Sequence, residues 1–348
     1  MNTQSSRIPV TIVTGFLGSG KTTLLNRLLG HVNGKRIAII ENEFGEVSID
    51  DALLVESNQT VFRMSDGCLC CTINGDLIKT LEDLLERRAE FDYLIIETTG
   101  IANPVPVVQT FMVNEDIAEA FVLDAVVTTI DAKHVLQHIE SKECQAQIAL
   151  ADILIINKLD LVDMPQAERV EQELRTINGV ARVFKTERSA LALSDILGQG
   201  LFNGEHSLLD SLPVPTEESD HEHHGCDHDH DHCRHEHPHD HQHLHSHHHD
   251  EDVQSVGIEL KGKLDRDRFN LWFSELIQSL GERIYRCKGI LRVDGDQRKT
   301  IVQTVHRVSE VLIGADDFSD EPVCKIVFIG RGLDREALVS GFKACLVQ

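Results

Sequence analysis

The segment Gly15–Thr22 constrains the fold of this chain more than any other. It matches the pattern G-x-x-x-x-G-K-[ST] without a mismatch. An apolar run over Pro9–Thr14 predicts a buried strand before it, and a leucine-rich segment over Thr22–Leu29 predicts a helix after it. In such a strand–loop–helix unit, backbone N–H groups surround phosphate oxygens at a helix N-terminus. We therefore predict nucleotide binding by Gly15, Gly18, Ser19, Gly20, Lys21, Thr22 and Thr23.

The same segment and a second one predict the chemistry on the phosphates. Lys21 is expected to reach the β- and γ-phosphates, and the Thr22 hydroxyl is expected to bind Mg²⁺. The predicted strand Tyr93–Glu97 ends in an acid where ordinary GTPases have Asp, so we expect Glu97 to hold Mg²⁺ directly or through water. The N–H of Gly100 is placed to sense the γ-phosphate. The predicted catalytic residues are Lys21, Thr22 and Glu97.

A third segment indicates which nucleotide is bound. Asn157-Lys158-Leu159-Asp160 follows the buried strand predicted at Ile153–Ile156, at the edge where ligands bind in such sheets. A carboxylate at Asp160 accepts from both N1–H and the amino group of guanine, whereas adenine would leave it unpaired. Asn157 would brace the loop or contact the base, and the Lys158 stem would lie on the base. Together with the phosphate loop, this segment predicts GTP.

Apolar runs alternate with helical patterns over the first two hundred or so residues, which predicts an α/β P-loop GTPase domain with a mostly parallel sheet. A second region has several strand patterns but few helices, which predicts a smaller α+β domain. One of its predicted strands runs over Thr300–Val311. The predicted boundaries are residues 1–212 for the first domain, 213–252 for a disordered His/Asp-rich linker and 253–348 for the second domain.

Composition excludes several classes of partner. The formal net charge of −24 opposes binding to nucleic acid and to anionic membranes. Aromatic residues make up only 5% of the chain, too few to suggest a stacking platform for single strands. No apolar run is long enough to span a bilayer. The nine cysteines do not suggest a disulfide framework in a chain of this size, so we expect a reducing, cytoplasmic location.

Three of those cysteines form a C-x-C-C cluster. Cys68, Cys70 and Cys71 lie within four residues, and a soft metal ion is their natural common partner. The adjacent pair differs from the usual spacing of structural zinc sites, which suggests a site that accepts and releases metal. Glu41 or Glu46, from the loop after the second predicted strand, could complete it. The alternatives are buried free cysteines or a redox pair.

Histidines are concentrated in one tract. Fifteen of the chain's twenty histidines lie between His221 and His249, interleaved with acids. Imidazoles suit Zn²⁺, Ni²⁺, Co²⁺ and Cu²⁺, but a tract without a fixed geometry should bind with modest affinity and little selectivity. We interpret it as a metal store or funnel, and the alternative is an acidic, soluble spacer.

These motifs occur together in one known family. GFLGSGKTT at Gly15–Thr23, ENEFGE at Glu41–Glu46, GCLCC at Gly67–Cys71, ETTG at Glu97–Gly100 and NKLD at Asn157–Asp160 resemble the CobW/YjiA-type GTPases, also called the zinc-chaperone GTPase family. The resemblance covers nearly the whole chain, because the family also has a smaller C-terminal domain after a linker. One mild departure is Thr99, where many members have Ser.

The resemblance implies a metallochaperone. Cys68, Cys70 and Cys71 would be the metal ligands, with Glu41 or Glu46 as co-ligands, and hydrolysis of GTP to GDP and phosphate would control transfer of zinc to a client metalloprotein. GTP, Mg²⁺ and Zn²⁺ are the expected cofactors, with Co²⁺ or Ni²⁺ left open. One alternative is a cobalt carrier that serves cobalamin synthesis or a cobalt enzyme, and another is a metal-sensing or storage switch. Whether the chain forms a homo-oligomer is left open.

Overall fold

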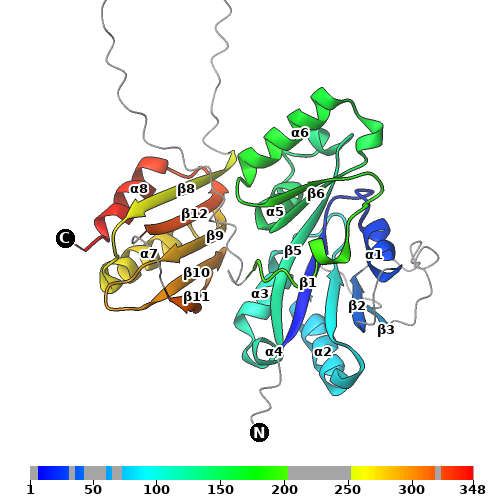
Figure 1. Ribbon diagram of the computed structural model, residues 1–348, viewed down its shortest axis with the longest axis horizontal. Helices are drawn as coiled ribbons and strands as arrows, with labels where there is room; N and C mark the ends of the chain where they lie inside the picture. Colours follow the sequence, from blue (N-terminus) through cyan, green and yellow to red (C-terminus); the bar gives the residue numbers. More distant parts are fainter. Residues whose placement is uncertain are drawn as a thin grey trace, which may run out of the picture.

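A seven-stranded parallel sheet organises the N-terminal part of the chain (Figure 1). The computed structural model describes residues 7–30, 36–42, 60–64, 73–202, 252–317 and 323–347. The strand order is β3-β2-β4-β1-β5-β6-β7, and each neighbouring pair is parallel. The strands are β1 (Ile8–Thr14), β2 (Ile37–Asn42), β3 (Thr60–Met64), β4 (Tyr93–Glu97), β5 (Phe121–Asp131), β6 (Ile153–Asn157) and β7 (Arg182–Lys185). The predicted α/β class is confirmed.

Helices cover both faces of this sheet because its strands are apolar on both sides. One face packs against α2 to α6, and the other packs against α1 and the segment around Ile196–Leu201. The helices are α1 (Lys21–Gly30), α2 (Ile73–Glu86), α3 (Val105–Val113), α4 (Glu115–Ala120), α5 (Lys142–Leu150) and α6 (Met164–Ile177). Among the described helices, none is both long enough and apolar enough to cross a membrane.

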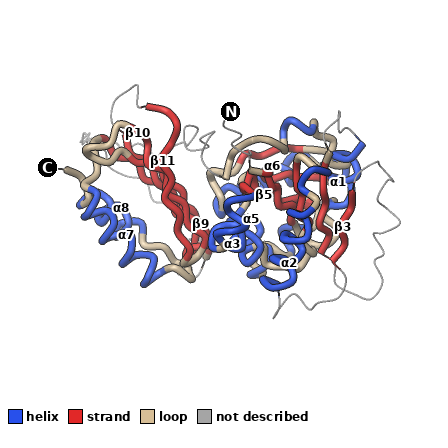
Figure 2. Tube along the Cα trace, turned by 90° about the horizontal axis from the view of Figure 1, so that it is seen from below, coloured by secondary structure: helices blue, strands red, loops and turns tan. Residues whose placement is uncertain are grey.

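A second, antiparallel sheet forms the C-terminal part, in the order β11-β10-β9-β12-β8. Two helices pack on its outer face, as Figure 2 shows, and the opposite face lies toward α3 and α5 of the first sheet. The elements are β8 (Val253–Lys261), α7 (Arg266–Leu280), β9 (Ile284–Leu291), β10 (Arg298–Val305), β11 (Val308–Asp317), β12 (Val323–Arg331) and α8 (Arg335–Ala344). The predicted α+β class is confirmed, whereas the predicted domain boundaries stay predictions.

The single strand predicted over Thr300–Val311 is wrong. The structure divides this segment into β10 and β11, which pair antiparallel from Val305 and Val308 outward. His306, between them, has φ +52°, a left-handed conformation that reverses the chain. The continuous β-branched pattern hid this turn because His and Arg are not typical turn residues.

The two sheets meet through an apolar cluster and a buried ionic group. Val253, Val327 and Ile329 of the second sheet join the cluster that contains α5 and α6. Asp152, fully buried between α5 and β6, accepts hydrogen bonds from Arg286 Nη2 at 2.7 Å and Lys288 Nζ at 2.5 Å. The N-terminal and C-terminal parts of the chain are therefore packed together, side by side in Figure 1.

Candidate nucleotide-binding site

The phosphate loop connects β1 to α1 at the carboxyl edge of the sheet. Two positions in this loop must be glycine, because neighbouring atoms leave no room for a Cβ and because the backbone has a positive φ. Gly15 has φ +140°, and a Cβ there would lie 2.3 Å from the Thr129 carbonyl oxygen. Gly20 has φ +109°, and a Cβ there would lie 2.3 Å from Asn157 Nδ2. Side chains larger than hydrogen are excluded at both places, so the loop stays tight against the strands behind it.

The side chains expected to contact phosphate and Mg²⁺ lie immediately after this loop, in the first turn of α1. Lys21 is buried, and its Nζ donates to the Gly15 carbonyl at 2.9 Å, so the ammonium lies inside the loop. Thr22 and Thr23 occupy the first turn of α1, where Thr22 is half-buried and Thr23 exposed. A loop with an internal ammonium at a helix N-terminus fits a phosphate chain, and a hydroxyl beside it fits Mg²⁺.

Buried hydroxyl groups on neighbouring strands hold this loop. Ser19 Oγ lies 2.6 Å from Thr129 Oγ1 of β5. Thr98 Oγ1, which follows β4, donates to Thr14 Oγ1 at 2.8 Å. The role of Thr129 was missed in the sequence because a threonine within an apolar strand carries no motif.

Asn157 joins the predicted base-reading segment to the phosphate loop. Its Nδ2 donates to the Ser19 carbonyl at 3.0 Å, and its Oδ1 accepts from the Ser189 N–H at 2.8 Å. Of the two roles predicted for Asn157, the geometry therefore favours bracing. Ser189 is fully buried with φ +53°, and it was not predicted because its segment matches no motif used in the sequence analysis.

Lys158 is held in place by a carboxylate at the end of β5. Its backbone is left-handed, with φ +64°, and its Nζ donates to Asp131 Oδ2 at 2.8 Å. The same oxygen lies 3.0 Å from Nδ1 of His134. Burial by itself raises the pKa of Asp131, but the hydrogen bonds from Lys158, His134 and the Lys133 N–H outweigh it and lower that pKa. Asp160, two residues beyond Lys158, is exposed and open to a base.

The γ-phosphate side of the site is built by the ends of three strands. Glu97 of β4 is in register with Glu41 of β2 and with Val13 of β1, directly before the phosphate loop. Cross-strand partners lie on the same face of a sheet, so the two carboxylates are neighbours at its carboxyl edge. Both are half-buried. This places Glu97 where Mg²⁺ is expected and Glu41 beside it.

Gly100 presses against the phosphate loop. A Cβ at this position would lie 2.6 Å from the Leu17 backbone nitrogen. From the other side, Gln147 of α5 donates to the carbonyl oxygens of Gly100 at 3.2 Å and Ala102 at 3.1 Å. Gln147 is a residue that the sequence analysis missed, since it lies in a helix without a recognisable periodicity.

The predicted thiol site lies mostly outside the described residues. This applies to Cys68, Cys70, Cys71 and Glu46, and also to the histidine tract. Within the described part of the chain, no group of three or more His, Cys, Asp or Glu side chains is arranged to hold a metal ion. Of the five ligands predicted for the thiol site, Glu41 is the one that lies within the described residues, and the thiol site stays a prediction.

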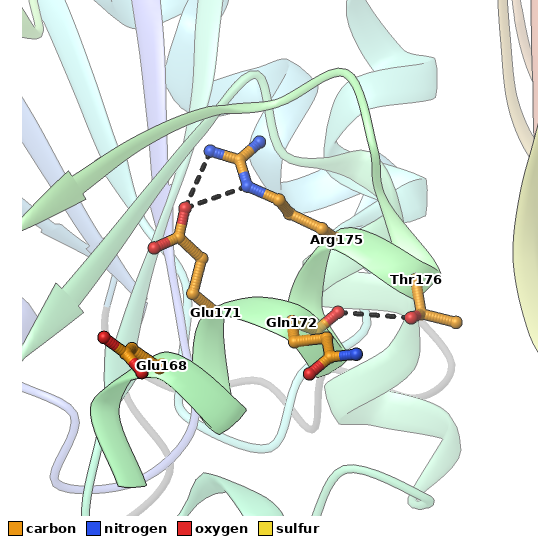
Figure 3. A pocket seen from close by; sticks show the side chains of 5 residues that line it. All are labelled: Glu168, Glu171, Gln172, Arg175 and Thr176. Carbon is orange, nitrogen blue, oxygen red and sulfur yellow. Dashed lines mark hydrogen bonds and ion pairs between the residues drawn. The ribbon is translucent and has the colours of Figure 1, made fainter. Parts of the chain in front are cut away.

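A depression on α6 is lined by charged side chains but by none of the nucleotide motifs (Figure 3). Glu171 in this depression is paired with Arg175 at 2.9 Å and with Lys185 at 2.6 Å. Its lining residues are Glu168, Glu171, Gln172, Arg175 and Thr176. Exposed ion pairs of this kind give no chemistry of their own, so the phosphate-loop region is the candidate site.

Two family models match the chain. Residues 9–185 match the model described as CobW/HypB/UreG, nucleotide-binding domain. Residues 253–346 match the model described as cobalamin synthesis protein cobW C-terminal domain.

Several known proteins are similar over long stretches. The "zinc chaperone YjiA" of Escherichia coli is 30% identical over 340 residues, which cover 96% of this chain and 98% of that protein. The "zinc-regulated GTPase metalloprotein activator 1" of Schizosaccharomyces pombe is 38% identical over 209 residues, which cover 58% of this chain and about half, 51%, of that longer protein. The crystal structure of Zn(II)-bound YjiA GTPase from E. coli has a TM-score of 0.71 and 27% identity, and the match covers 98% of this chain and all of that one.

Proposed function

Because this chain belongs to the CobW/HypB/UreG family of nucleotide-binding proteins, we propose that it is a GTP-hydrolysing metallochaperone. In this proposal it binds zinc at its C-x-C-C motif and delivers it to a client metalloprotein under the control of GTP. The observation that carries the nucleotide part is the hydrogen bonding of Asn157, whose side chain donates to the Ser19 carbonyl and accepts from the Ser189 N–H. The bond to Ser19 attaches the proposed base-reading segment directly to the phosphate loop.

Guanine recognition is assigned to the segment Asn157–Asp160. Asp160 is exposed at the end of β6, and its carboxylate can accept two N–H groups from guanine. Lys158 is fixed by Asp131, so its stem offers an ordered surface for the base. An adenine ring would leave the carboxylate without its donors, which supports selection of GTP over ATP.

Hydrolysis is assigned to the phosphate loop and the strand ends beside it. Lys21 and the loop N–H groups would stabilise negative charge that develops on the phosphoryl oxygens as water attacks to give GDP and phosphate. Thr22 and Glu97 would hold Mg²⁺, which supplies further charge neutralisation when it is bound. The N–H of Gly100 is assigned to the γ-phosphate, and Gln147 holds this residue in place through its carbonyl oxygen.

Zinc binding is assigned to Cys68, Cys70 and Cys71, with Glu41 or Glu46 as co-ligand. Strand β3 ends at Met64, which is in register with Asn42, next to Glu41. The four-residue connection from Met64 to Cys68 spans at most about 14 Å, so the thiols are tethered to the edge that carries Glu41 and Glu97. The relatives named as a zinc chaperone and as a zinc-regulated GTPase support zinc as the cargo.

The cytoplasm is the proposed location. The four described cysteines, Cys144, Cys287, Cys324 and Cys345, are buried free thiols, which fits a reducing compartment. The client metalloprotein is identified here only by its need for zinc.

The coupling of nucleotide to metal is tested by zinc titration of the full chain loaded with GDP or with a non-hydrolysable GTP analogue. We expect the two loaded forms to differ in zinc affinity by about tenfold. Cys70→Ala should abolish this difference, whereas binding to the histidine tract should persist in both forms.

The matched control is Cys345→Ala. Burial raises the pKa of the Cys345 thiol, so it stays protonated and is a poor zinc ligand. This variant should titrate like the unchanged chain. Equal zinc affinities of the two nucleotide forms would contradict the proposed control by GTP.

A further inference from the structure

Helix α5 lies between the C-terminal sheet and the loop after β4, residues 98–102, which we call the γ-phosphate loop because the proposed function assigns Gly100 to that phosphate. Every residue from Cys144 to Leu150 is buried, although the helix is only nine residues long and contains two glutamines. A helix that is buried all round has neighbours on every side. Figures 1 and 2 show these neighbours: the parallel sheet on one side and the antiparallel sheet on the other.

Gln147 faces the loop that follows β4. Its side-chain amide donates to two carbonyl oxygens, those of Gly100 and Ala102, and only an NH₂ group can bond both. The orientation of the amide is therefore fixed by its partners. Gly100 in turn lies directly against Leu17 of the phosphate loop, so Gln147 holds the residue at which these two loops meet.

Two polar atoms around this loop are buried and have no hydrogen-bond partner among the residues that the structure describes. They are Gln147 Oε1 and Thr99 Oγ1. A buried polar atom without a partner is unfavourable, so a second arrangement of the loop that gives these two atoms partners would gain hydrogen bonds. Loops that respond to a γ-phosphate have two such arrangements.

Gln145 faces the other way. Residues two apart on a helix point about 200° from each other, so Gln145 and Gln147 lie on nearly opposite sides of α5. Gln145 Oε1 accepts from Arg331 Nη2 of β12 at 2.6 Å. The carbonyl of Leu150, at the end of the same helix, accepts from Arg286 of β9. Helix α5 is thus attached to the C-terminal sheet at both its middle and its end.

We propose that Gln147 is the positioning residue of the γ-phosphate loop, and that α5 links the docking of the C-terminal sheet to the GTP-bound state of that loop. The inference rests on the proposed function only in taking GTP as the nucleotide. By linkage, whatever loosens the attachment of α5 to the C-terminal sheet changes the affinity for GTP more than that for GDP. The C-terminal domain then acts on the nucleotide site without contacting it.

The first test compares nucleotide affinities of full-length variants. Gln147→Met keeps the volume and removes both donors, so affinity for a non-hydrolysable GTP analogue should fall about tenfold while affinity for GDP changes less than about twofold. Gln303→Met is the matched control, because Gln303 is equally buried but donates to Glu310 within the C-terminal sheet. It should lower the melting temperature and leave the ratio of GTP-analogue to GDP affinity unchanged.

The second test removes one of the contacts between α5 and the C-terminal sheet. Arg331→Met removes the hydrogen bond to Gln145 and should weaken the GTP analogue about fivefold relative to GDP. In the double variant with Gln147→Met the two effects should not add, because both act through α5. Independent, additive effects, or variants that weaken both nucleotides equally, would overturn the proposal.

Hydrogen exchange on the unchanged chain keeps the inference testable if Gln147→Met does not fold. Amides of residues 98–102 and of α5 should be protected together by the GTP analogue and not by GDP. Protection of the loop alone would refute the link to α5. Failure of the proposed function would give a different result. In that case the unchanged chain would bind ATP more tightly than GTP, or would bind no nucleotide.

Discussion

Asp131 is the side chain that holds together the proposed base-binding segment. It accepts from Lys158 Nζ, from the N–H groups of Lys133 and His134, and pairs with the His134 ring. These partners come from the residue that follows β6 and from the turn after β5. One carboxylate therefore fixes both the lysine expected to lie against guanine and the turn beside it.

We predict that Asp131→Asn weakens binding of GTP and GDP equally, by about tenfold. The neutral amide loses the charge-assisted bond to Lys158, and the base is common to both nucleotides. Titration with a fluorescent GDP analogue, and competition by GTP, measures both affinities.

Glu171→Gln is the control, because Glu171 also bonds a lysine, Lys185, but in the open depression on α6. It should leave both affinities unchanged. If Asp131→Asn lowered the affinity for GTP but not for GDP, Asp131 would act at the γ-phosphate, and its assignment to the base would be wrong.

At the scale of elements, helix starts follow local rules. Ser141, Asp163, Asp265 and Asp334 each accept a hydrogen bond from the backbone N–H three residues later, at the starts of α5, α6, α7 and α8. Such capping residues satisfy N–H groups that the helix leaves unbonded. Asp265, the capping residue of α7, allows this contribution to stability to be measured.

We predict that Asp265→Ala lowers the free energy of unfolding by about 1 kcal/mol, because the Arg268 N–H loses its acceptor at 2.9 Å. Urea unfolding monitored by circular dichroism gives this value. Asp294→Ala, which removes an exposed ion pair with Lys263, should cost less than about 0.5 kcal/mol. Similar costs for the two variants would argue against a capping role.

At the scale of the whole molecule, the two sheets meet at a buried ionic group that contains two cations and one carboxylate. Asp152 is buried with Arg286 and Lys288, and the Arg286 guanidinium also lies 5.0 Å from the centre of the Phe202 ring. Burial and then the charge of Arg286 lower the pKa of Lys288 to about 8, against the opposing effect of Asp152. Burial alone would raise the pKa of Asp152, but the two cations lower it.

This interface should make stability depend on alkaline pH. An unfolded lysine keeps its proton up to about pH 10.4, whereas folded Lys288 releases it near pH 8. Between these values the unfolded state binds more protons, so the contribution of Lys288 to the free energy of unfolding rises with pH, by up to about 3 kcal/mol.

The measurement is the difference in unfolding free energy between the unchanged chain and Lys288→Met, taken from pH 7.5 to pH 10. Alkaline effects of other groups cancel in this difference, because they are common to both proteins. The free energy of unfolding of the unchanged chain should increase relative to that of Lys288→Met as the pH rises. A difference that is constant with pH would show that Lys288 titrates normally in the folded protein.

Much of the architecture was predictable from the chain because its signals are local. Buried parallel strands such as Ile153–Asn157 are continuous apolar runs, and the phosphate loop is one contiguous strand–loop–helix segment. The helical pattern of the segment Arg266–Leu280 predicts a helix with the same bounds as α7. Strand β7 and helices α3, α4 and α5 were missed. Strand β7 is four residues long without a buried position, and α5 is buried all round, so neither shows a period.

The sequence by itself thus determined the fold class and the family, while its assignments of individual site residues stay predictions. Tertiary structure alone decided which groups support those residues. Asp131 contacts Lys158 from 27 positions away, Gln147 contacts Gly100 from 47, and Arg331 contacts Gln145 from 186. No local sequence pattern predicts such pairs, because residues this far apart in the chain come into contact only when the sheets assemble and pack.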